Sequence, residues 1–142
     1  MEYYTGNRSS GADGIAVAFY TDTSTNLPDG EYLGFVGGKG YGVELDTYYN
    51  YDDPYDNHIG LIQGNTHNHL TTASLPESED GMWHTLTIDV TDNLCSVYVD
   101  GNLKFTYVIE YAGSGCFGIS AATGSRRNLH AIRNINVIEK YE

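Results

Sequence analysis

The order of apolar and polar residues along the chain predicts an all-β protein. Short apolar runs recur at spacings of roughly 8 to 12 residues, with turn residues between them, which is typical of an antiparallel sandwich or barrel. In several runs apolar side chains alternate with small or polar ones, as at Ile15, Val17 and Phe19, and no segment has the apolar period of a helix. We expect about ten strands, over residues 15–19, 32–36, 43–47, 59–62, 70–75, 83–90, 94–99, 103–109, 116–122 and 129–138.

Composition agrees with a single β-sandwich and excludes some partners. The chain has 142 residues, among them 13 tyrosines and 17 glycines, so one domain over residues 1–142 is the economical interpretation. Seven basic against 19 acidic residues give a net charge of −12, which would repel a nucleic acid. No apolar run approaches the roughly 20 residues that a membrane helix needs, so membrane insertion is not expected.

One acidic segment, residues 43–60, carries most of the chemical information. Side chains of a strand alternate between its faces, so Glu44 and Asp46 should share one surface. The loop that follows contains Asn50, Asp52, Asp53 and Asp56, and the next strand begins near His58. A solvated acidic turn would explain this pattern, but so would a metal site. Carboxylates with an amide and a backbone carbonyl suit Ca²⁺, while carboxylates with an imidazole suit Mn²⁺ or another first-row divalent ion.

Four stretches, in the same order along the chain, together resemble the L-type, or legume-type, lectin family. Ordered motifs over most of a chain are much more specific than any one motif alone. They are Gly11-Ala12-Asp13-Gly14-Ile15-Ala16, Tyr32-Leu33-Gly34-Phe35, the acidic segment with Glu44-Leu45-Asp46-Thr47-Tyr48, Asn50, Asp53-Pro54 and His58-Ile59-Gly60, and Gly118-Ile119-Ser120-Ala121-Ala122-Thr123-Gly124 followed by His130. The resemblance implies an antiparallel concanavalin-like, jelly-roll β-sandwich.

The resemblance also implies a pair of metal ions in the acidic segment. The transition metal, Mn²⁺ or another first-row divalent ion, would be held by Glu44, Asp46, Asp53 and His58. The Ca²⁺ ion would be held by Asp46, Asn50, Asp53 and the backbone carbonyl of Tyr48. Asp52 is an alternative to its neighbour Asp53, which we prefer because Pro54 and the spacing to His58 match the family.

A sugar site built on this loop is the function that the resemblance implies. Asp13 would accept hydrogen bonds from sugar hydroxyls, the Asn50 amide would donate one, and the Tyr48 ring would cover the apolar face of the pyranose. The Ala12-Asp13 peptide is expected to be cis. Two further elements stay open: a backbone N–H from Gly30 or Glu31, and the specificity loop 123–128. That loop contains Ser125, Arg126 and Arg127, whose cations are either solvated or contact an acidic sugar.

Other functions and residues were weighed against this interpretation. Laminarinase-like hydrolases share the sandwich but use Glu-x-Asp-x-Glu, and here Tyr48 stands where the last Glu would be, so we expect no enzyme. A structural or protein-binding sandwich is the other alternative. Trp83 is expected in the core, and His84 in a strand without a chemical role. His67 and His69 are expected to be incidental, and Cys95 and Cys116 are as readily free as paired.

The resemblance bears on the context of the domain as well. Family domains usually carry a long further stretch before the Gly11-Ala12-Asp13 motif, so residues 1–142 are expected to lack N-terminal strands of the full domain. No signal peptide follows Met1. We therefore expect the domain to belong to a longer secreted or cell-surface precursor, with glycans as partners, as a homo-oligomer or within a larger multidomain parent.

Overall fold

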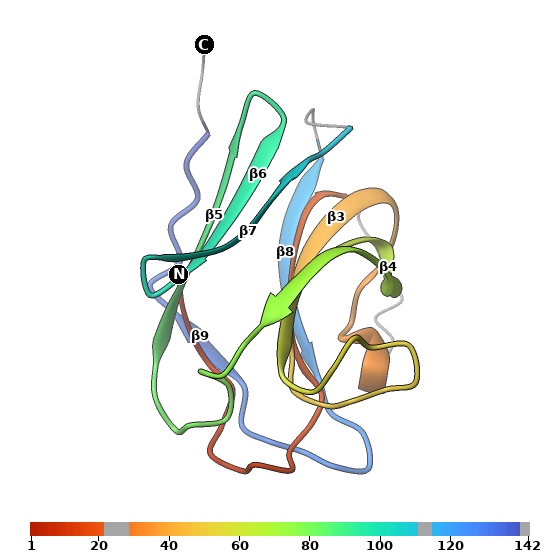
Figure 1. The fold of residues 1–142 in the computed structure, drawn as a ribbon, viewed down its shortest axis with the longest axis vertical. Coiled ribbons are helices and arrows are strands. Elements are labelled where there is room, and N and C mark those ends of the chain that lie inside the picture. The colour runs from red at the N-terminus through yellow and green to blue at the C-terminus, as the bar shows by residue number, and fades with distance from the viewer. Residues whose placement is uncertain (22–28, 111–114, 140–142) are drawn as a thin grey trace.

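The computed structural model describes residues 1–21, 29–110 and 115–139 and shows two layers of antiparallel strands (Figure 1). Nine strands and one short 3-10 helix lie in these residues, and none of their helices could span a membrane. In chain order the elements are β1 (Glu2–Tyr4), β2 (Gly14–Thr21), η1 (Gly30–Tyr32), β3 (Val36–Asp46), β4 (His58–Ser74), β5 (His84–Thr91), β6 (Leu94–Val99), β7 (Asn102–Val108), β8 (Cys116–Ala122) and β9 (Ala131–Arg133).

The strands form one sheet in the order β7-β6-β5-β1-β9 and a second in the order β4-β3-β2-β8. In the second sheet, Gly14 of β2 pairs with Asp46 of β3 and with Ala122 of β8. Three of the motifs noted in the sequence therefore meet at one end of this sheet. The all-β sandwich predicted from the alternation of apolar residues is confirmed.

The main core lies between the two sheets. Val43 and Leu45 of β3 are fully buried there, against residues of β5, β6 and β7 such as Leu86, Val97 and Phe105. Removing each such side chain from water stabilises the fold by about 1.5 to 3 kcal/mol. The intervening residues of β3 therefore point to the opposite face of the second sheet, where a smaller cluster lies.

That smaller apolar cluster explains why residues 32–36 do not form a separate strand. After η1 the chain turns at Leu33, which has a positive φ of 52° and is fully buried. Leu33 and Phe35 pack on Ala16 and Ile62, on the outer face of the second sheet. The strand expected over 32–36 is therefore wrong except at Val36, where β3 begins. Packing of Leu33 and Phe35 on the sheet holds the rest of the segment, together with a hydrogen bond from the Ser120 hydroxyl to the Leu33 carbonyl.

The expected strands 59–62 and 70–75 both fall on β4, except for Leu75, which follows its last residue; β4 turns back on itself. Gly64 has a φ of 78°, a conformation that glycine adopts readily. Beyond it, the N–H of Leu75 donates to the carbonyl of Asn57 at 2.8 Å. The second half of β4 thus returns beside the first (Figure 1), and brings residues eleven positions apart in sequence into contact.

Two short strands complete the differences from the sequence prediction. β1 was not expected, because three residues are too few for a pattern to be seen. The run 129–138 contains only the short β9; Ile135, Val137 and Ile138 beyond it are exposed.

Trp83, expected in the core, is only partly buried, and the Arg133 guanidinium lies 4.0 Å from the centre of its ring.

Candidate functional site

The acidic segment forms a buried cluster on the outer face of the second sheet. Glu44 and Asp46 lie on the same face of β3, as their spacing predicts, and are 0% and 2% exposed. Asp46 of β3 pairs with His58 of β4, and Asp53 lies in the loop between these two strands. One ligand atom from each of Asp46, Asp53 and His58 lies within 4.8 Å of the others. Buried carboxylates this close repel one another unless cations offset their charge.

His58 is held with a defined orientation. Its Nδ1 lies 3.1 Å from the carbonyl oxygen of Tyr55, and because a carbonyl only accepts, Nδ1 carries the proton that is donated. The other ring nitrogen, Nε2, faces the cluster and lies 3.0 Å from Oε1 of Glu44. A histidine fixed by a backbone carbonyl in this way is typical of metal ligands. Oε2 of Glu44 is buried with no hydrogen-bond partner.

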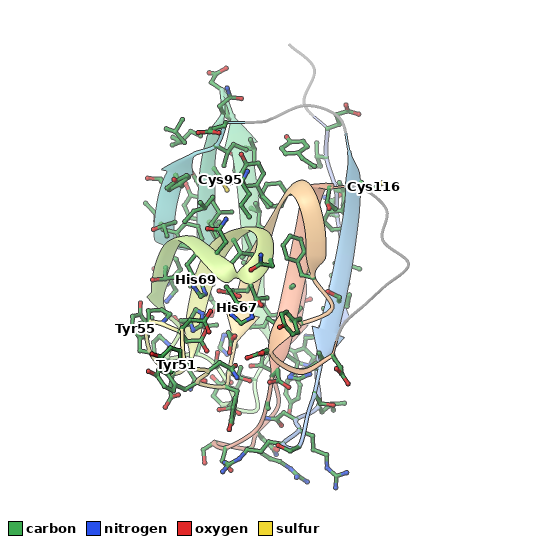
Figure 2. The ribbon with its side chains drawn as sticks, turned by 90° about the vertical axis from the view of Figure 1, so that its right-hand side faces the viewer. Tyr51, Tyr55, His67, His69, Cys95 and Cys116 are labelled. Carbon is green, nitrogen blue, oxygen red and sulfur yellow. The ribbon has the colours of Figure 1, made fainter. Side chains whose placement is uncertain are left out.

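His69, expected to be incidental, lies in this cluster. It comes from the second half of β4, and Figure 2 shows it on the returning strand above the acidic loop. Its Nε2 is 2.6 Å from Oε1 of Glu44 and 4.0 Å from Oδ1 of Asp53. Glu44, His58 and His69 form a second group whose ligand atoms lie within 4.8 Å of one another. The expectation for His69 assumed that no third ligand was near, and this assumption is wrong.

Burial and neighbouring charges perturb the pKa values of the cluster. Burial, together with the Glu44 charge, raises the pKa of Asp46 well above its ordinary value. Burial also raises the pKa of Asp53. The pKa of Glu44 is lowered, because contacts with His58 and His69 outweigh burial, and the pKa of each histidine is raised by Glu44. The protonation states of these five side chains therefore depend on one another.

Backbone hydrogen bonds order the loop between β3 and β4. The Tyr48 N–H donates to Oδ1 of Asp46 at 2.9 Å. The Asn50 N–H donates to Oδ2 of Asp53 at 2.5 Å, and the Asp53 N–H returns a hydrogen bond of 3.1 Å to the Asn50 carbonyl. Asp52, the alternative ligand, points elsewhere and pairs with His67. The geometry thus favours Asp53 over Asp52 for the metal cluster.

Asp13 lies beside the start of this loop. The Ala12-Asp13 peptide is cis, which confirms the expectation from the resemblance. The N–H and the Oγ1 hydroxyl of Thr47 donate to the Asp13 carbonyl at 2.8 and 3.1 Å, and the Asp13 N–H donates to the Ala122 carbonyl. Burial, then the nearby Glu31 and Asp29 charges, raises the pKa of the Asp13 carboxyl to about 6. Its Oδ2 is buried with no partner.

Comparison with solved structures gives many matches to lectins of one fold. The chain overlies basic winged bean lectin, solved with Tn-antigen, with a TM-score of 0.77 at 20% identity over 91% of this chain and 63% of that chain. Peanut lectin gives a TM-score of 0.72 at 24% identity over 91% and 63%. The VIP36 exoplasmic/lumenal domain, in a Ca²⁺/Man-bound form, gives 0.71 at 18% identity over 91% and 62%. The chain has the L-type lectin fold.

The L-type lectin fold is thus established from structure, and the jelly-roll sandwich expected from the motifs is confirmed. No protein-family model and no curated protein matches the chain. The chain spans slightly over three fifths of the length of the lectins that it overlies, 63% for the winged bean protein.

The loop 123–128, which the resemblance expects to influence sugar choice, lies near Tyr48. The Gly124 N–H donates to the Arg126 carbonyl at 3.1 Å, which forms a tight turn. The Arg126 guanidinium then lies 5.8 Å from the centre of the Tyr48 ring. Both residues line a cleft of about 250 Å³, which also includes Glu79 but neither Asp13 nor Asn50. Arg126 therefore lies beside Tyr48, and Ser125, Arg126 and Arg127 are all exposed on this loop.

Gly124 lies against the carboxyl group of Asp13, and Gly30 lies beside Gly124. A Cβ on Gly124 would lie 3.4 Å from Oδ2 of Asp13 and 3.8 Å from the Cα of Gly30. Gly30 therefore does lie at the site. Oε1 of Glu31, the next residue in η1, lies 4.0 Å from Nε2 of His67. The exposed His67 also pairs with Asp52 and so connects η1 to the acidic loop.

Two groups of residues lie apart from the site. Cys95 and Cys116 are both free, on strands of different sheets (Figure 2). His84, expected to have no chemical role, bridges two carboxylates: Nδ1 lies 2.7 Å from Asp100 and Nε2 lies 2.9 Å from Asp80. No sequence pattern predicts this bridge, because Asp80 and Asp100 come from different turns.

Proposed function

We propose that this domain is a carbohydrate-binding lectin domain whose sugar site is ordered by Ca²⁺ and a first-row divalent ion, Mn²⁺ or another. The site would accept glycans outside the cytosol, on a cell surface or in a polysaccharide. Several lectins of the same fold were solved with sugars, among them the winged bean acidic lectin with methyl-α-D-galactose. These proteins support the proposal at the level of fold, and the residues of this chain support it further.

The observation that carries the proposal is the direct link between Asp13 and the acidic cluster. Thr47, the residue after Asp46, donates two hydrogen bonds to the Asp13 carbonyl. The position of Asp13 therefore depends on the same end of β3 that bears the carboxylate cluster. A cation that fixes the loop also fixes the carboxylate that would accept the sugar hydroxyls.

Each residue has a defined part in this proposal. The Asp13 carboxylate accepts from sugar hydroxyls, the Asn50 side-chain amide donates, and the Tyr48 ring covers an apolar sugar face. A backbone N–H from Gly30 or Glu31 completes the polar set. The loop with Ser125 and Arg126 contacts the outer part of the sugar, where a guanidinium would favour a carboxylate-bearing one.

The residues present fit the two implied ions. Two groups of ligand atoms share the inward-turned Nε2 side of His58, one with Asp46 and Asp53 and one with Glu44 and His69, and one oxygen of Glu44 is buried without a partner. Glu44, Asp46, Asp53 and His58 would hold the first-row ion; Asp46, Asn50, Asp53 and the Tyr48 carbonyl would hold Ca²⁺, a cation that prefers oxygen. When bound, the ions supply positive charge that offsets the carboxylates and orders the loop.

Variants at the sugar-binding positions test the proposal. Asp13→Asn should abolish binding to a glycan array while metal content and the melting temperature stay near those of wild type. Asn50→Ala should also abolish binding, and because it removes a proposed Ca²⁺ ligand it should lower the Ca²⁺ content as well. Tyr51→Phe, on the same loop, is the control: Tyr51 is 99% exposed and does not line the cleft beside Tyr48, so this variant should bind as wild type does. Wild-type binding by either of the first two variants would show that the assigned sugar site is wrong.

A further inference from the structure

We propose that His69 is a ligand of the transition-metal site, so that the site binds a nitrogen-preferring ion such as Zn²⁺ more tightly than Mn²⁺. This inference rests on the metal site of the proposed function and identifies the class of ion that the site takes. His69 adds a second imidazole to a ligand set in which the sequence motifs supply only one.

The first argument is position. His69 arrives at the cluster from the returning half of β4, while His58 lies at the start of the same strand. The two rings are 5.4 Å apart, centre to centre, at an angle of 71°. Both Nε2 atoms face Oε1 of Glu44, at 3.0 and 2.6 Å. The three side chains are 0 to 13% exposed, so the group lies just beneath the surface.

The second argument is that ordinary hydrogen bonding does not satisfy these atoms. Nε2 of His69 and Oε2 of Glu44 are both buried with no hydrogen-bond partner, although His69 is only 2.6 Å from Oε1. Donor atoms that share one ion at about 2.1 Å lie about 3 Å apart. Close contacts without hydrogen-bond geometry are therefore what joint coordination of one ion would produce.

The third argument is that the backbone leaves space for Glu44 to reach His69. Gly60 pairs with Glu44 across β3 and β4. A Cβ on Gly60 would lie 2.8 Å from Oε1 of Glu44 and 3.4 Å from Thr72 on the returning half of β4. The absence of a side chain at this position lets the carboxylate extend over β4 to the second imidazole.

Ligand chemistry then determines the ion. Two imidazoles with carboxylates suit Zn²⁺, Ni²⁺ or Cu²⁺, whereas sites dominated by oxygen suit Mn²⁺ and Ca²⁺. In the general order of affinities, Mn²⁺ binds most weakly of the first-row divalent ions and Zn²⁺ much more tightly. A second nitrogen ligand increases that difference.

The test measures metal binding alone. Protein stripped with EDTA is titrated calorimetrically with Zn²⁺ and, separately, with Mn²⁺, for wild type, His69→Gln and the matched control His67→Gln. His67 lies two positions away on β4 and contacts Asp52 and not Glu44. We expect His69→Gln to weaken Zn²⁺ binding at least about tenfold, since even indirect partners of a metal ligand cost roughly 10- to 100-fold, while Mn²⁺ affinity changes less. His67→Gln should keep the wild-type ratio.

A spectroscopic readout separates a ligand from a merely structural residue. The visible spectrum of bound Co²⁺ should change in His69→Gln and not in His67→Gln. An unchanged Zn²⁺ to Mn²⁺ affinity ratio and an unchanged Co²⁺ spectrum in His69→Gln would overturn this inference. If His69→Gln still binds glycans when metal is present, the proposed function stands without this inference. If wild type binds no divalent ion at all, both proposals fail.

Discussion

The guanidinium of Arg126 lies 5.8 Å from the centre of the Tyr48 ring. Tyr48 is the ring that we propose to cover a sugar face, so the cation of the specificity loop lies where the outer part of a sugar would be. An arginine at this distance both stacks on the aromatic ring and can pair with a carboxylate. This relationship gives the two arginines of the loop different expected roles.

Arg126→Ala should reduce binding of glycans that carry a carboxylate and leave or improve binding of neutral ones. A lost charge-assisted hydrogen bond of about 1.5 to 3 kcal/mol corresponds to roughly 10- to 100-fold in affinity. Arg127→Ala, the adjacent exposed residue, is the control. Glycan arrays with matched acidic and neutral sugars measure both effects, and equal losses for the two variants would contradict a specific role for Arg126.

Glycan binding should weaken as the pH falls through about 6. Burial and the charges of Glu31 and Asp29 raise the pKa of Asp13 to about 6. Below that pH the carboxyl is protonated in the free protein and accepts fewer hydrogen bonds from sugar hydroxyls. Affinity measured between pH 5 and 8 at saturating metal checks this.

The variant Asp29→Asn distinguishes this effect from loss of metal. Asp29 is exposed and contributes to the raised pKa of Asp13. Its replacement should move the midpoint of the binding curve to lower pH. A midpoint that stays unchanged while metal is lost in parallel would assign the pH dependence to the metal ligands instead.

The His84 bridge should stabilise the fold in a pH-dependent way. Burial opposes a charged His84, but its hydrogen bonds with Asp100 and Asp80 outweigh burial and raise its pKa above 6.5. Its contribution is therefore fully present below pH 6.5 and is lost as the pH rises through the raised pKa of the folded state.

Replacement by His84→Gln should lower the free energy of unfolding by about 1 kcal/mol at pH 6, a modest value because the two aspartates are 34% and 39% exposed. The difference from wild type should shrink above the raised pKa. Asp80→Asn, which removes one of the two carboxylate charges, should show a smaller loss. Urea unfolding from pH 5 to 9 measures this, and a difference that is constant with pH would refute it.

The sequence predicts this fold well where side chains alternate over several residues. β8 has the predicted bounds Cys116–Ala122, and the buried Val43 and Leu45 lie on the opposite face of β3 from Glu44, as expected. Where the chain is fixed by contacts distant in sequence, the prediction fails. The segment around Leu33 and Phe35 reads as a strand but is held by packing on Ala16 and Ile62.

The same limit applies to the candidate site. The spacing of Glu44, Asp46 and His58 around one strand pair is local, and so these residues could be predicted together. His69 could not, because its approach to Glu44 depends on the reversal of β4 near Gly64. The only sequence signal would have been an alternation of His67 and His69 on a strand that follows a metal-type motif.

The most direct test of the central claim is a glycan array probed with wild-type protein before and after metal removal by EDTA, with a thermal melt of each sample. We predict that metal removal eliminates glycan binding and lowers the melting temperature, because the carboxylates of Glu44, Asp46 and Asp53 then repel one another. Adding back Ca²⁺ together with a first-row divalent ion should restore both. Undiminished glycan binding and an unchanged melting temperature after complete metal removal would contradict the account.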